Sequence, residues 1–245
     1  SVDLLVTAYN KIPYEVSISV IAPDGAYMLM ENVMVSSGTD DVLDYGEAGQ
    51  LYFTFENVGS DPSEELTFSL SHGGSMVDIL TENIILESVA AGDEVTVGPF
   101  EIEVSWNVED GAHIDFTVFV TNGSDSWEFD TDVIVEAPAY QLLSTELLND
   151  LNGTLDPGES AILQVVMKNV GHAPVIYPDF EGTTSDPYIS IGNIVSDNDY
   201  LWDIDTDITL IIEVEAESDA PVGHSALTAI PVSYTHLTLP TNKAV

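Results

Sequence analysis

Apolar and polar residues alternate along most of the chain, which is the pattern of β-strands with one face buried. The two clearest segments are residues 100–108 and 208–216, where Glu side chains fall between the apolar ones. Shorter alternating segments lie at residues 51–55, 66–70, 116–120, 127–135 and 163–167. No segment keeps a helical period over about 11 residues. The pattern therefore predicts strands throughout and argues against folds that alternate helices with strands.

Turn-forming residues divide these segments into short strands at intervals of about 8–12 residues. The turns are expected at Asn57–Pro62, His72–Gly74, Asn122–Gly123 and Asp156–Gly158. Short strands at this spacing are typical of immunoglobulin-like antiparallel sandwiches. Because the chain has no Cys, an inter-sheet disulfide, a thiolate metal site and a Cys nucleophile are excluded. The core must depend on apolar burial, at about 25 cal/mol per Å².

The chain contains an internal repeat. Residues 44–62 align without a gap with residues 156–174, at an offset of 112 residues, which is the difference between positions 44 and 156. The identical positions are Asp44, Gly46, Glu47, Leu51, Asn57, Val58, Gly59 and Pro62, which recur as Asp156, Gly158, Glu159, Leu163, Asn169, Val170, Gly171 and Pro174. Upstream, Ala22-Pro23 corresponds to Ala137-Pro138. Each repeat therefore starts near an Ala-Pro pair, and a period of this size indicates tandem domains.

The repeat predicts an all-β chain of tandem immunoglobulin-like antiparallel β-sandwiches with Greek-key topology. We expect residues 1–22 to be the terminal strands of a preceding domain, 23–137 the first sandwich and 138–231 the second, truncated sandwich. The chain begins in mid-pattern at Ser1 without an initiator Met or a signal peptide, so we expect it to be an internal piece of a longer protein.

The end of the chain has a different composition, because no residue from Ala220 to Val245 is acidic. The segment Pro231–Asn242 resembles the translation of a transposon-derived sequencing adapter, so we interpret residues 232–245 as a non-native tail. The alternative is an acid-poor last strand, since Leu237 and Leu239 alternate with polar residues. At the 112-residue offset the closing strand 126–135 corresponds to residues 238–247. We therefore expect the second sandwich to lack its proper closing strand, with Tyr234–Leu239 as a poor substitute.

The charge of the chain restricts its partners. There are 43 acidic and 3 basic residues, a formal net charge of -40, yet 44% of the residues are hydrophobic and the mean hydropathy is +0.15, so a folded polyanion is expected. With no Arg and only Lys11, Lys168 and Lys243, nucleic acids and anionic lipids are excluded as direct partners. No apolar run reaches the ~20 residues of a membrane-spanning helix. Salt or divalent cations would screen the self-repulsion, which favours an extracellular or cell-surface location.

Two segments carry a family resemblance. Asn149–Gly171, an Asp/Asn/Gly-rich loop followed by Pro-Gly-Glu, an alternating strand and Lys-Asn-Val-Gly, is similar to bacterial cell-adhesion-related immunoglobulin-like domains. Val6–Tyr27 resembles the strand pair and linker that follow the catalytic domain in secreted gingipain-type cysteine peptidases. The resemblance implies a bacterial surface protein with a caspase-like domain, containing Cys and His, upstream in the parent chain. None of its catalytic residues has a counterpart here.

The most plausible chemistry of the sequence is calcium binding. Asp150, Asn152, Asp156 and Glu159 lie in one ten-residue loop, and Ca²⁺ accepts such carboxylate and amide oxygens in irregular geometries. The first repeat offers Asp40, Asp41, Asp44 and Glu47. An EF-hand is excluded, because Gly153 is fourth and not sixth in the loop and Ala161 occupies the twelfth position. The competing interpretation is a turn that leads into a strand.

Other candidate sites are weaker. His72, His113, His172 and His224 are the possible general bases, but none lies in a nucleophile elbow or a His-Glu-x-x-His helix, so we expect no enzyme activity from this segment. Trp106, Trp127 and Trp202 could form a glycan-binding platform. The first two share the apolar phase of their strands and are expected in the core, which leaves Trp202.

Three functions remain open from the sequence. The first is a structural spacer or adhesion module of a secreted multidomain protein, with an upstream catalytic domain as its partner in the parent chain. The second is a calcium-dependent adhesion or glycan-binding module, with a surface glycan or protein as partner. The third, an independent hydrolase, has no supporting motif, and we favour the first.

Overall fold

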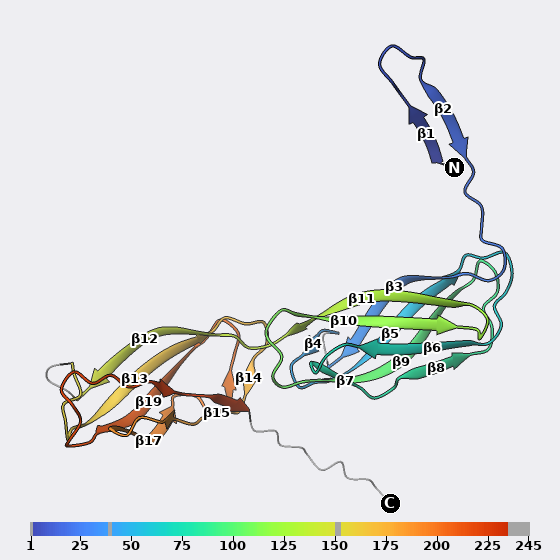
Figure 1. The fold of residues 1–245 in the computed structure, drawn as a ribbon. Coiled ribbons are helices and arrows are strands. Elements are labelled where there is room, and N and C mark those ends of the chain that lie inside the picture. Colours follow the sequence, from blue (N-terminus) through green and yellow to red (C-terminus); the bar gives the residue numbers. More distant parts are fainter. Residues whose placement is uncertain (1, 39–40, 150–152, 235–245) are drawn as a thin grey trace, which may run out of the picture. The chain divides into compact units, whose positions relative to one another are not determined.

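The computed structural model describes residues 2–38, 41–149 and 153–234. Within these ranges all the regular secondary structure is β-strand (Figure 1). The described residues include no helix that is long and apolar enough to cross a membrane. The chain divides into two compact units, residues 1–106 with 113–134, and residues 107–112 with 135–245. The prediction of an all-β, immunoglobulin-like antiparallel fold is confirmed.

The first unit contains two antiparallel sheets. The four-stranded sheet has the order β3 (Met28–Ser37), β5 (Ala48–Asn57), β9 (Glu94–Val104), β7 (Val77–Ile79). The five-stranded sheet has the order β4 (Leu43–Asp44), β11 (Ser126–Glu136), β10 (Ala112–Thr121), β6 (Leu66–His72), β8 (Asn83–Leu86). The first sheet has the order of the A-B-E-D sheet of immunoglobulin domains, and β11, β10 and β6 have that of the G-F-C sheet, which β4 and β8 extend at its two edges.

Alternate residues of both sheets meet in the core of the first unit. Phe53, Phe55 and Phe100 of one sheet and Phe68 and Phe116 of the other are almost completely buried. The rings of Phe55 and Phe68 lie 5.0 Å apart, so the two sheets pack face to face. The period-2 pattern of the sequence thus marks the residues of the core.

The second unit repeats the four-stranded sheet, in the order β12 (Tyr140–Leu148), β13 (Ser160–Asn169), β19 (Asp207–Ala216), β17 (Ile189–Ser196). Its other layer consists of short antiparallel pairs. They are β14 (Val175–Ile176) with β18 (Leu201–Trp202), β15 (Pro178–Phe180) with β21 (Val232–Tyr234), and β16 (Thr183–Thr184) with β20 (Thr228–Ala229).

The sequence repeat is also a repeat of strand register. Met28 pairs with Asn57 in the first unit, and Tyr140 pairs with Asn169, 112 residues further along, in the second. Both pairs of strands also carry a register shift at the same place, after Met30 and after Leu142. A β-bulge adds one unpaired residue to one strand, so even this irregularity recurs.

The last described strand follows the same rule. Thr67 pairs with Thr121 in the first unit, and Asp179 pairs with Ser233 at the same offset in the second. Val232–Tyr234, which begins the segment set apart as a tail in the sequence, therefore occupies the place of the end of β10. The rest of the predicted substitute strand, residues 235–239, and the predicted closing strand at 238–247 lie outside the described residues.

One predicted strand is shorter than expected. The alternation from Phe100 to Val108 predicts a single strand, but β9 ends at Val104. The chain turns after it, and Trp106 packs edge-on against Tyr45, with ring centroids 5.5 Å apart. Trp106 is half-buried in this turn, so it lies outside the strand whose apolar alternation it continues in the sequence.

The segment before the first sandwich is a β-hairpin. β1 (Val2–Val6) and β2 (Tyr14–Ile18) pair with each other in an antiparallel two-stranded sheet. The apolar side chains of both strands, except the half-buried Val16, are exposed, among them Leu4 and Leu5. A two-stranded hairpin alone is marginally stable in water, and the assignment of residues 1–22 to a preceding domain stays a prediction.

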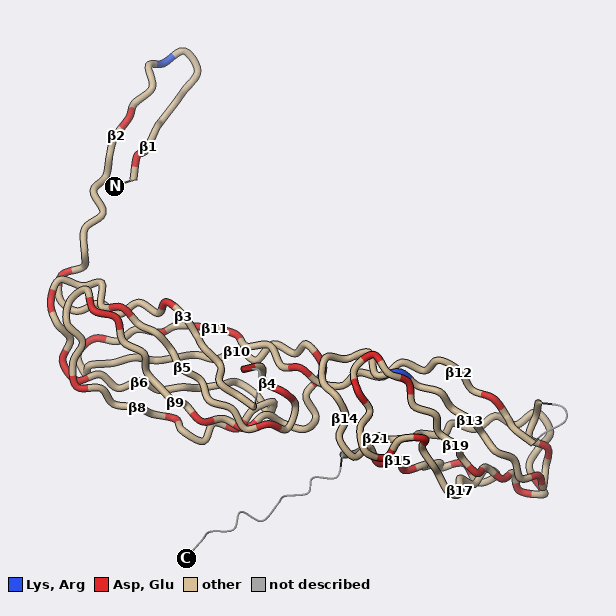
Figure 2. The backbone as a smooth tube through the Cα atoms, turned by 180° about the vertical axis from the view of Figure 1, so that it is seen from behind, with Lys and Arg blue, Asp and Glu red and all other residues tan. Residues whose placement is uncertain are grey.

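Acidic residues lie along both units, while Lys is rare (Figure 2). The buried polar residues among those described are Ser37, Asn57, Ser63 and Asn169, and none of them is charged. The acids therefore occupy surface positions, where water and salt screen their repulsion. Lys168 Nζ forms an ion pair with Asp205 Oδ1 at 3.0 Å.

Candidate functional site

The recurring Asp-x-Gly-Glu motif forms the turn that leads into the second strand of each four-stranded sheet. In the first unit Asp44 N donates to Glu47 Oε2 at 3.2 Å, and Glu47 N donates to Asp44 O at 3.2 Å. In the second unit Asp156 N donates to Glu159 Oε2 at 2.8 Å, and Glu159 N donates to Asp156 O at 3.0 Å. The intervening Gly residues have φ values of 66° and 79°, which Gly adopts without strain. The Glu carboxylate is thus part of the turn in both units.

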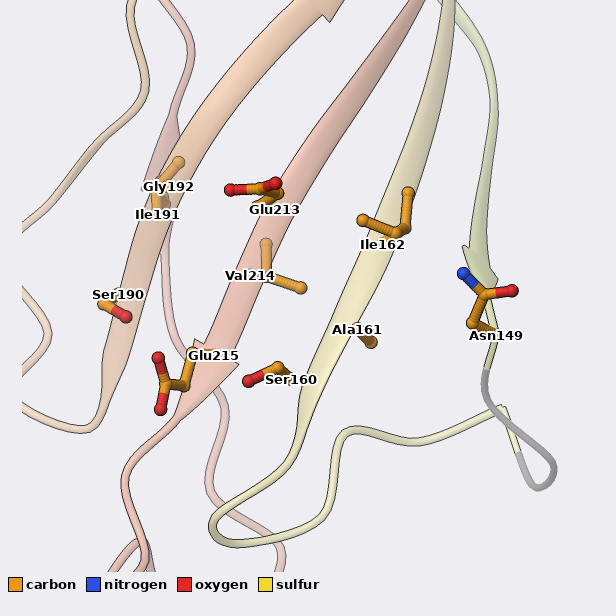
Figure 3. Close-up of a pocket in the computed structure, with 10 residues that line it drawn as sticks. All are labelled: Asn149, Ser160, Ala161, Ile162, Ser190, Ile191, Gly192, Glu213, Val214 and Glu215. Carbon is orange, nitrogen blue, oxygen red and sulfur yellow. The ribbon is translucent and has the colours of Figure 1, made fainter.

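A surface hollow lies at the same end of each four-stranded sheet. It has a volume of about 400 Å³ in the second unit (Figure 3) and about 370 Å³ in the first. The lining residues that correspond at the 112-residue offset are Ser37, Ala48, Gly49, Gln50, Glu101 and Ile102 in the first unit and Asn149, Ser160, Ala161, Ile162, Glu213 and Val214 in the second. The hollow is therefore a product of the repeated fold.

The side chains of the second hollow are hydroxyl, amide and carboxylate groups set among apolar residues. Glu215 extends from β19 between Ser160 and Ser190, and Glu213 lies further along the same strand, beside Gly192 (Figure 3). Glu213 Oε2 accepts a hydrogen bond from Asn193 N at 3.3 Å. The lining supplies acceptors for a cation or a hydrogen-bond donor and contains no His.

The four predicted calcium ligands are only partly placed by the structure. Asp150 and Asn152, like Asp40 of the first repeat, lie outside the described residues, and Asp156 and Glu159 lie in the turn described above. Among the described residues, no three His, Cys, Asp or Glu side chains gather closely enough to hold a metal ion. Asn149, which precedes the loop, lines the hollow. The calcium site stays a prediction.

Calcium and salt should affect stability differently. Screening of the -40 charge should raise the melting temperature with NaCl. If the loop 150–159 binds Ca²⁺ with a Kd of about 10⁻⁴–10⁻³ M, Ca²⁺ at ten times the Kd should add about 1.4 kcal/mol. Differential scanning calorimetry in CaCl₂, MgCl₂ and chelator at matched ionic strength measures both effects, with Asp150→Ala as the variant that should lose the calcium response. Equal melting in all three solutions would exclude the metal site.

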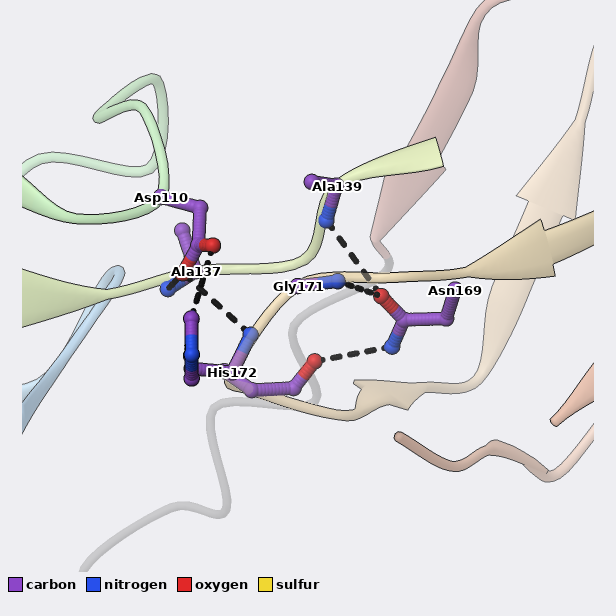
Figure 4. Close-up of polar contacts among 7 residues, drawn as sticks. Asp110, Ala137, Ala139, Asn169, Gly171 and His172 are labelled. Carbon is purple, nitrogen blue, oxygen red and sulfur yellow. Dashed lines mark hydrogen bonds and ion pairs between the residues drawn. The ribbon is translucent and has the colours of Figure 1, made fainter. Parts of the chain in front are cut away.

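The Asn of the recurring Asn-Val-Gly motif is a buried side chain that makes several hydrogen bonds in each unit. Asn169 is buried, and its Oδ1 accepts hydrogen bonds from Gly171 N at 3.1 Å and Ala139 N at 3.3 Å, while Nδ2 donates to Ala173 O at 2.9 Å (Figure 4). Gly171 lies against the backbone of Ala137 and Pro138, where a Cβ atom would overlap it. The motif thus holds the segment that enters strand β12 against the end of β13.

The first unit has the same arrangement around Asn57. Its Oδ1 accepts from Tyr27 N at 3.0 Å and Gly59 N at 3.1 Å, and its Nδ2 donates to Asp61 O at 2.9 Å and Val89 O at 3.0 Å. The sequence singled out this Asn through the repeat but gave no role for it. Its partners lie up to 32 residues away in the chain, so only the folded structure shows what the side chain does.

Asp110 is a second anchor of the second unit, and no sequence pattern pointed to it. Its Oδ1 accepts from Ala137 N at 3.1 Å and His172 N at 3.2 Å, and its Oδ2 lies 2.9 Å from His172 Nδ1 (Figure 4). Partial burial opposes ionisation of Asp110, but the hydrogen bonds from Ala137 and His172 outweigh it and lower the pKa of its carboxyl. The hydrogen bond that His172 Nδ1 donates to the Asp110 carboxylate raises the pKa of His172 above its ordinary value of 6.5.

The Asp110–His172 pair should make stability depend on pH. Because the folded pKa of His172 is raised, its contribution is complete below 6.5 and is lost as pH rises through the folded pKa. The contribution of Asp110, whose pKa is lowered from 3.8, is lost only as pH falls through that lowered value. We therefore expect His172→Gln to lower the melting temperature more at about pH 5.5 than at about pH 8.5. In an Asp110→Asn background this difference should vanish, and a persisting difference would contradict the pairing.

The other His candidates are surface partners of nearby groups. His113 Nδ1 lies 2.6 Å from Asp132 Oδ2, His224 Nε2 lies 2.7 Å from Asp186 Oδ2, and His72 Nδ1 lies 2.8 Å from Asp115 O. The pKa of Asp186 is lowered, first by a hydrogen bond from Tyr188 N and then by His224, against the effect of partial desolvation. Each His therefore connects neighbouring segments of one unit.

The Trp residues do not form an exposed platform. Trp202, the residue left as a glycan-binding candidate, is 1% exposed, donates from Nε1 to Thr206 O at 3.0 Å and stacks on Tyr140 at 4.8 Å. That expectation is wrong because Asn198 turns the chain back, accepting from Tyr200 N at 3.1 Å and Leu201 N at 3.2 Å, which directs the indole inward. Trp127 is half-buried against Tyr27, at 6.2 Å.

Comparison with known proteins does not assign the chain to a family. No family model matches it, and no curated protein matches it. Similar solved structures include the secreted serine protease VesC from Vibrio cholerae (11% identity, 82% of this chain and 51% of that chain, TM-score 0.26). They also include the alpha-2-macroglobulin of E. coli (9%, 84% and 16%, TM-score 0.30) and the titin domains Z1Z2 in complex with telethonin (14%, 84% and 94%, TM-score 0.25). The chain thus spans about half of VesC and a small part of the macroglobulin.

Proposed function

We propose that this chain is a non-catalytic structural module, a pair of immunoglobulin-like sandwiches that acts as a spacer or adhesion segment in a secreted bacterial multidomain protein. The observation that carries the proposal is the role of the recurring residues. The Glu of each Asp-x-Gly-Glu turn binds backbone, and the Asn of each Asn-Val-Gly motif holds two segments together. The repeat preserves residues that build the sandwich.

The proposed parent protein is a gingipain-type cysteine peptidase, with this segment downstream of the catalytic domain. The support is the resemblance of Val6–Tyr27 and Asn149–Gly171 to the corresponding regions of those proteins. Sequencing the coding region upstream of Ser1 tests it directly. A caspase-like domain with a Cys and a His supports the proposal, and any other upstream domain removes the peptidase from it.

Single-molecule pulling of the full chain tests the spacer role. Each sandwich should unfold in one cooperative event, which releases about 115 residues or roughly 380–410 Å of extended chain from the first and about 94 residues or roughly 310–340 Å from the second. A chain that lengthens steadily under low force, without discrete events, would argue against a load-bearing role. Turnover of peptide, ester or glycoside substrates above the buffer rate would overturn the non-catalytic assignment. Glycan-array binding by the native chain would favour the adhesion form of the proposal.

A further inference from the structure

Two tyrosine side chains meet beside the β14–β18 strand pair of the second unit. Tyr177 follows β14, Tyr200 precedes β18, and Tyr177 N donates to Tyr200 O at 2.8 Å. The centroids of their rings lie 5.2 Å apart, and the ring planes make an angle of 84°. Tyr177 is 39% exposed and Tyr200 is 62% exposed. The two rings therefore form a right-angled corner at the surface, called the aromatic corner below.

The backbone holds both rings of the aromatic corner in place. Tyr200 N donates to Asn198 Oδ1 at 3.1 Å, and the adjacent residues Ile176 and Leu201 are paired in the strands. Tyr177 has a φ of 54°. This left-handed conformation is an outlier for a bulky residue, and strained positions of this kind are concentrated at functional sites. The fold thus accepts strain in order to keep the two rings together.

The sandwich itself does not need these rings. At the 112-residue offset Tyr177 corresponds to Glu65 and Tyr200 to Ser88, so the first unit folds with no aromatic residue at either position. The residues that recur in both repeats are instead those of the turns and of the Asn-Val-Gly motif. An exposed aromatic pair that is added to the repeated fold on a strained backbone indicates a binding site.

The charge around the aromatic corner selects the kind of ligand. Asp199 and Asp203 flank Tyr200 in the chain, Asp179 lies two residues after Tyr177, and all three are exposed. The chain as a whole has 43 acidic and 3 basic residues. Its negative potential concentrates cations at the surface and repels anions.

We propose that the aromatic corner binds a quaternary ammonium group. The face of a Tyr ring attracts a cation that lies within about 6 Å of the ring centroid. Because the centroids are 5.2 Å apart, one cation in the corner can lie within that distance of both rings. A Lys-type ammonium is strongly hydrated and stays in water, whereas methyl groups around the charge favour contact with the rings. This inference goes beyond the spacer role and does not depend on it.

A titration of the full chain with choline chloride tests the proposal. The ring signals of Tyr177 and Tyr200 are followed by NMR at constant ionic strength. The control ligand is 3,3-dimethylbutan-1-ol, which has the shape of choline without its charge. We expect choline to shift both ring signals saturably, and the alcohol to bind at least about threefold more weakly because it lacks the cation–π attraction. This comparison needs no variant and so does not depend on the folding of one.

Three variants locate the site. Tyr200→Leu removes one ring and should weaken choline binding by about three- to fivefold, whereas Tyr200→Phe keeps the ring face and should bind as the unchanged chain does. Tyr14→Leu is the matched control, since Tyr14 is 65% exposed in the N-terminal hairpin, and it should leave choline binding unchanged. Equal affinity of Tyr200→Leu and the unchanged chain would overturn the proposal.

The same titration separates this site from other kinds of binding. Equal affinity for choline and the alcohol, or similar shifts at Tyr14 and Tyr200, would overturn the proposal, because the effect would then be apolar contact or general attraction to a polyanion. Glucose that shifts the two ring signals at a lower concentration than choline would also overturn it, in favour of a glycan site. Phosphocholine distinguishes the source of the group. Weaker binding than choline, which the negative potential predicts, indicates a free amine, and tighter binding indicates a phosphocholine headgroup.

Discussion

Asn57→Ala is expected to destabilise the first unit by about 4 kcal/mol, because four backbone groups, two of them in buried hydrogen bonds, lose their partner, and each unsatisfied buried group costs about 1–3 kcal/mol. The groups are the N–H of Tyr27 and Gly59 and the C=O of Asp61 and Val89. Chemical denaturation followed by hydrogen exchange measures the loss in the first unit separately from the second.

Two further variants identify the cause of this loss. Asn57→Asp keeps the two acceptor contacts but turns a carboxylate oxygen toward two carbonyl groups, so it should be nearly as damaging as Asn57→Ala. Asn83→Ala removes an exposed side chain that makes one hydrogen bond, to Ser69, and should cost less than about 1 kcal/mol. Similar small losses for Asn57→Ala and Asn83→Ala would contradict the structural role of the buried side chain.

Gly59→Ala should destabilise the first unit by about 3 kcal/mol, since overpacking against rigid backbone is costly. A Cβ atom at this position would overlap the carbonyl oxygen of Gly25 and lie 2.6 Å from Tyr27 N. The same substitution at Gly73, where nothing lies within 4 Å of the new atom, is the matched control and should change stability by about 0.5 kcal/mol or less. If both variants unfold at the same urea concentration, the close approach of the backbone at Gly59 does not matter for stability.

Strand positions could be predicted because burial and alternation carry the same information in a half-buried sheet. The predicted segments 51–55, 66–70 and 163–167 fall within β5, β6 and β13. The end of β9 could not be predicted. Trp106 continues the apolar alternation of the strand, but it lies in the turn after the strand, where its ring covers Gly46. The burial of Trp202 could not be predicted either. Its strand, β18, has only two residues, which is too short for an alternation of apolar and polar residues to be seen.

The candidate sites were harder to predict than the strands. The repeat identified Glu47, Glu159, Asn57 and Asn169, but residue type alone made the Glu residues resemble ligands. Their carboxylates accept hydrogen bonds from the backbone three residues earlier. The hollows could not be found from sequence, because their lining comes from strands far apart in the chain. Asp110 has no counterpart in the other repeat, so no internal comparison could reveal it.

Each unit binds the segment through which the chain enters it, and this affects how the number of sandwiches in such a chain can change. The segments 25–27 and 137–139 are bound by the Asn and Gly that end β5 and β13 of the same unit. A crossover between misaligned copies of the gene, at equivalent points in the two repeats, would join residue 57 of one copy to residue 170 of another or the reverse. The hydrogen bonds that the Asn-Val-Gly motif makes with the entrance segment in both units would be re-formed by the same groups in the same register. Sandwiches could then be gained or lost in steps of 112 residues, the offset of the repeat, without a new packing problem at the junction.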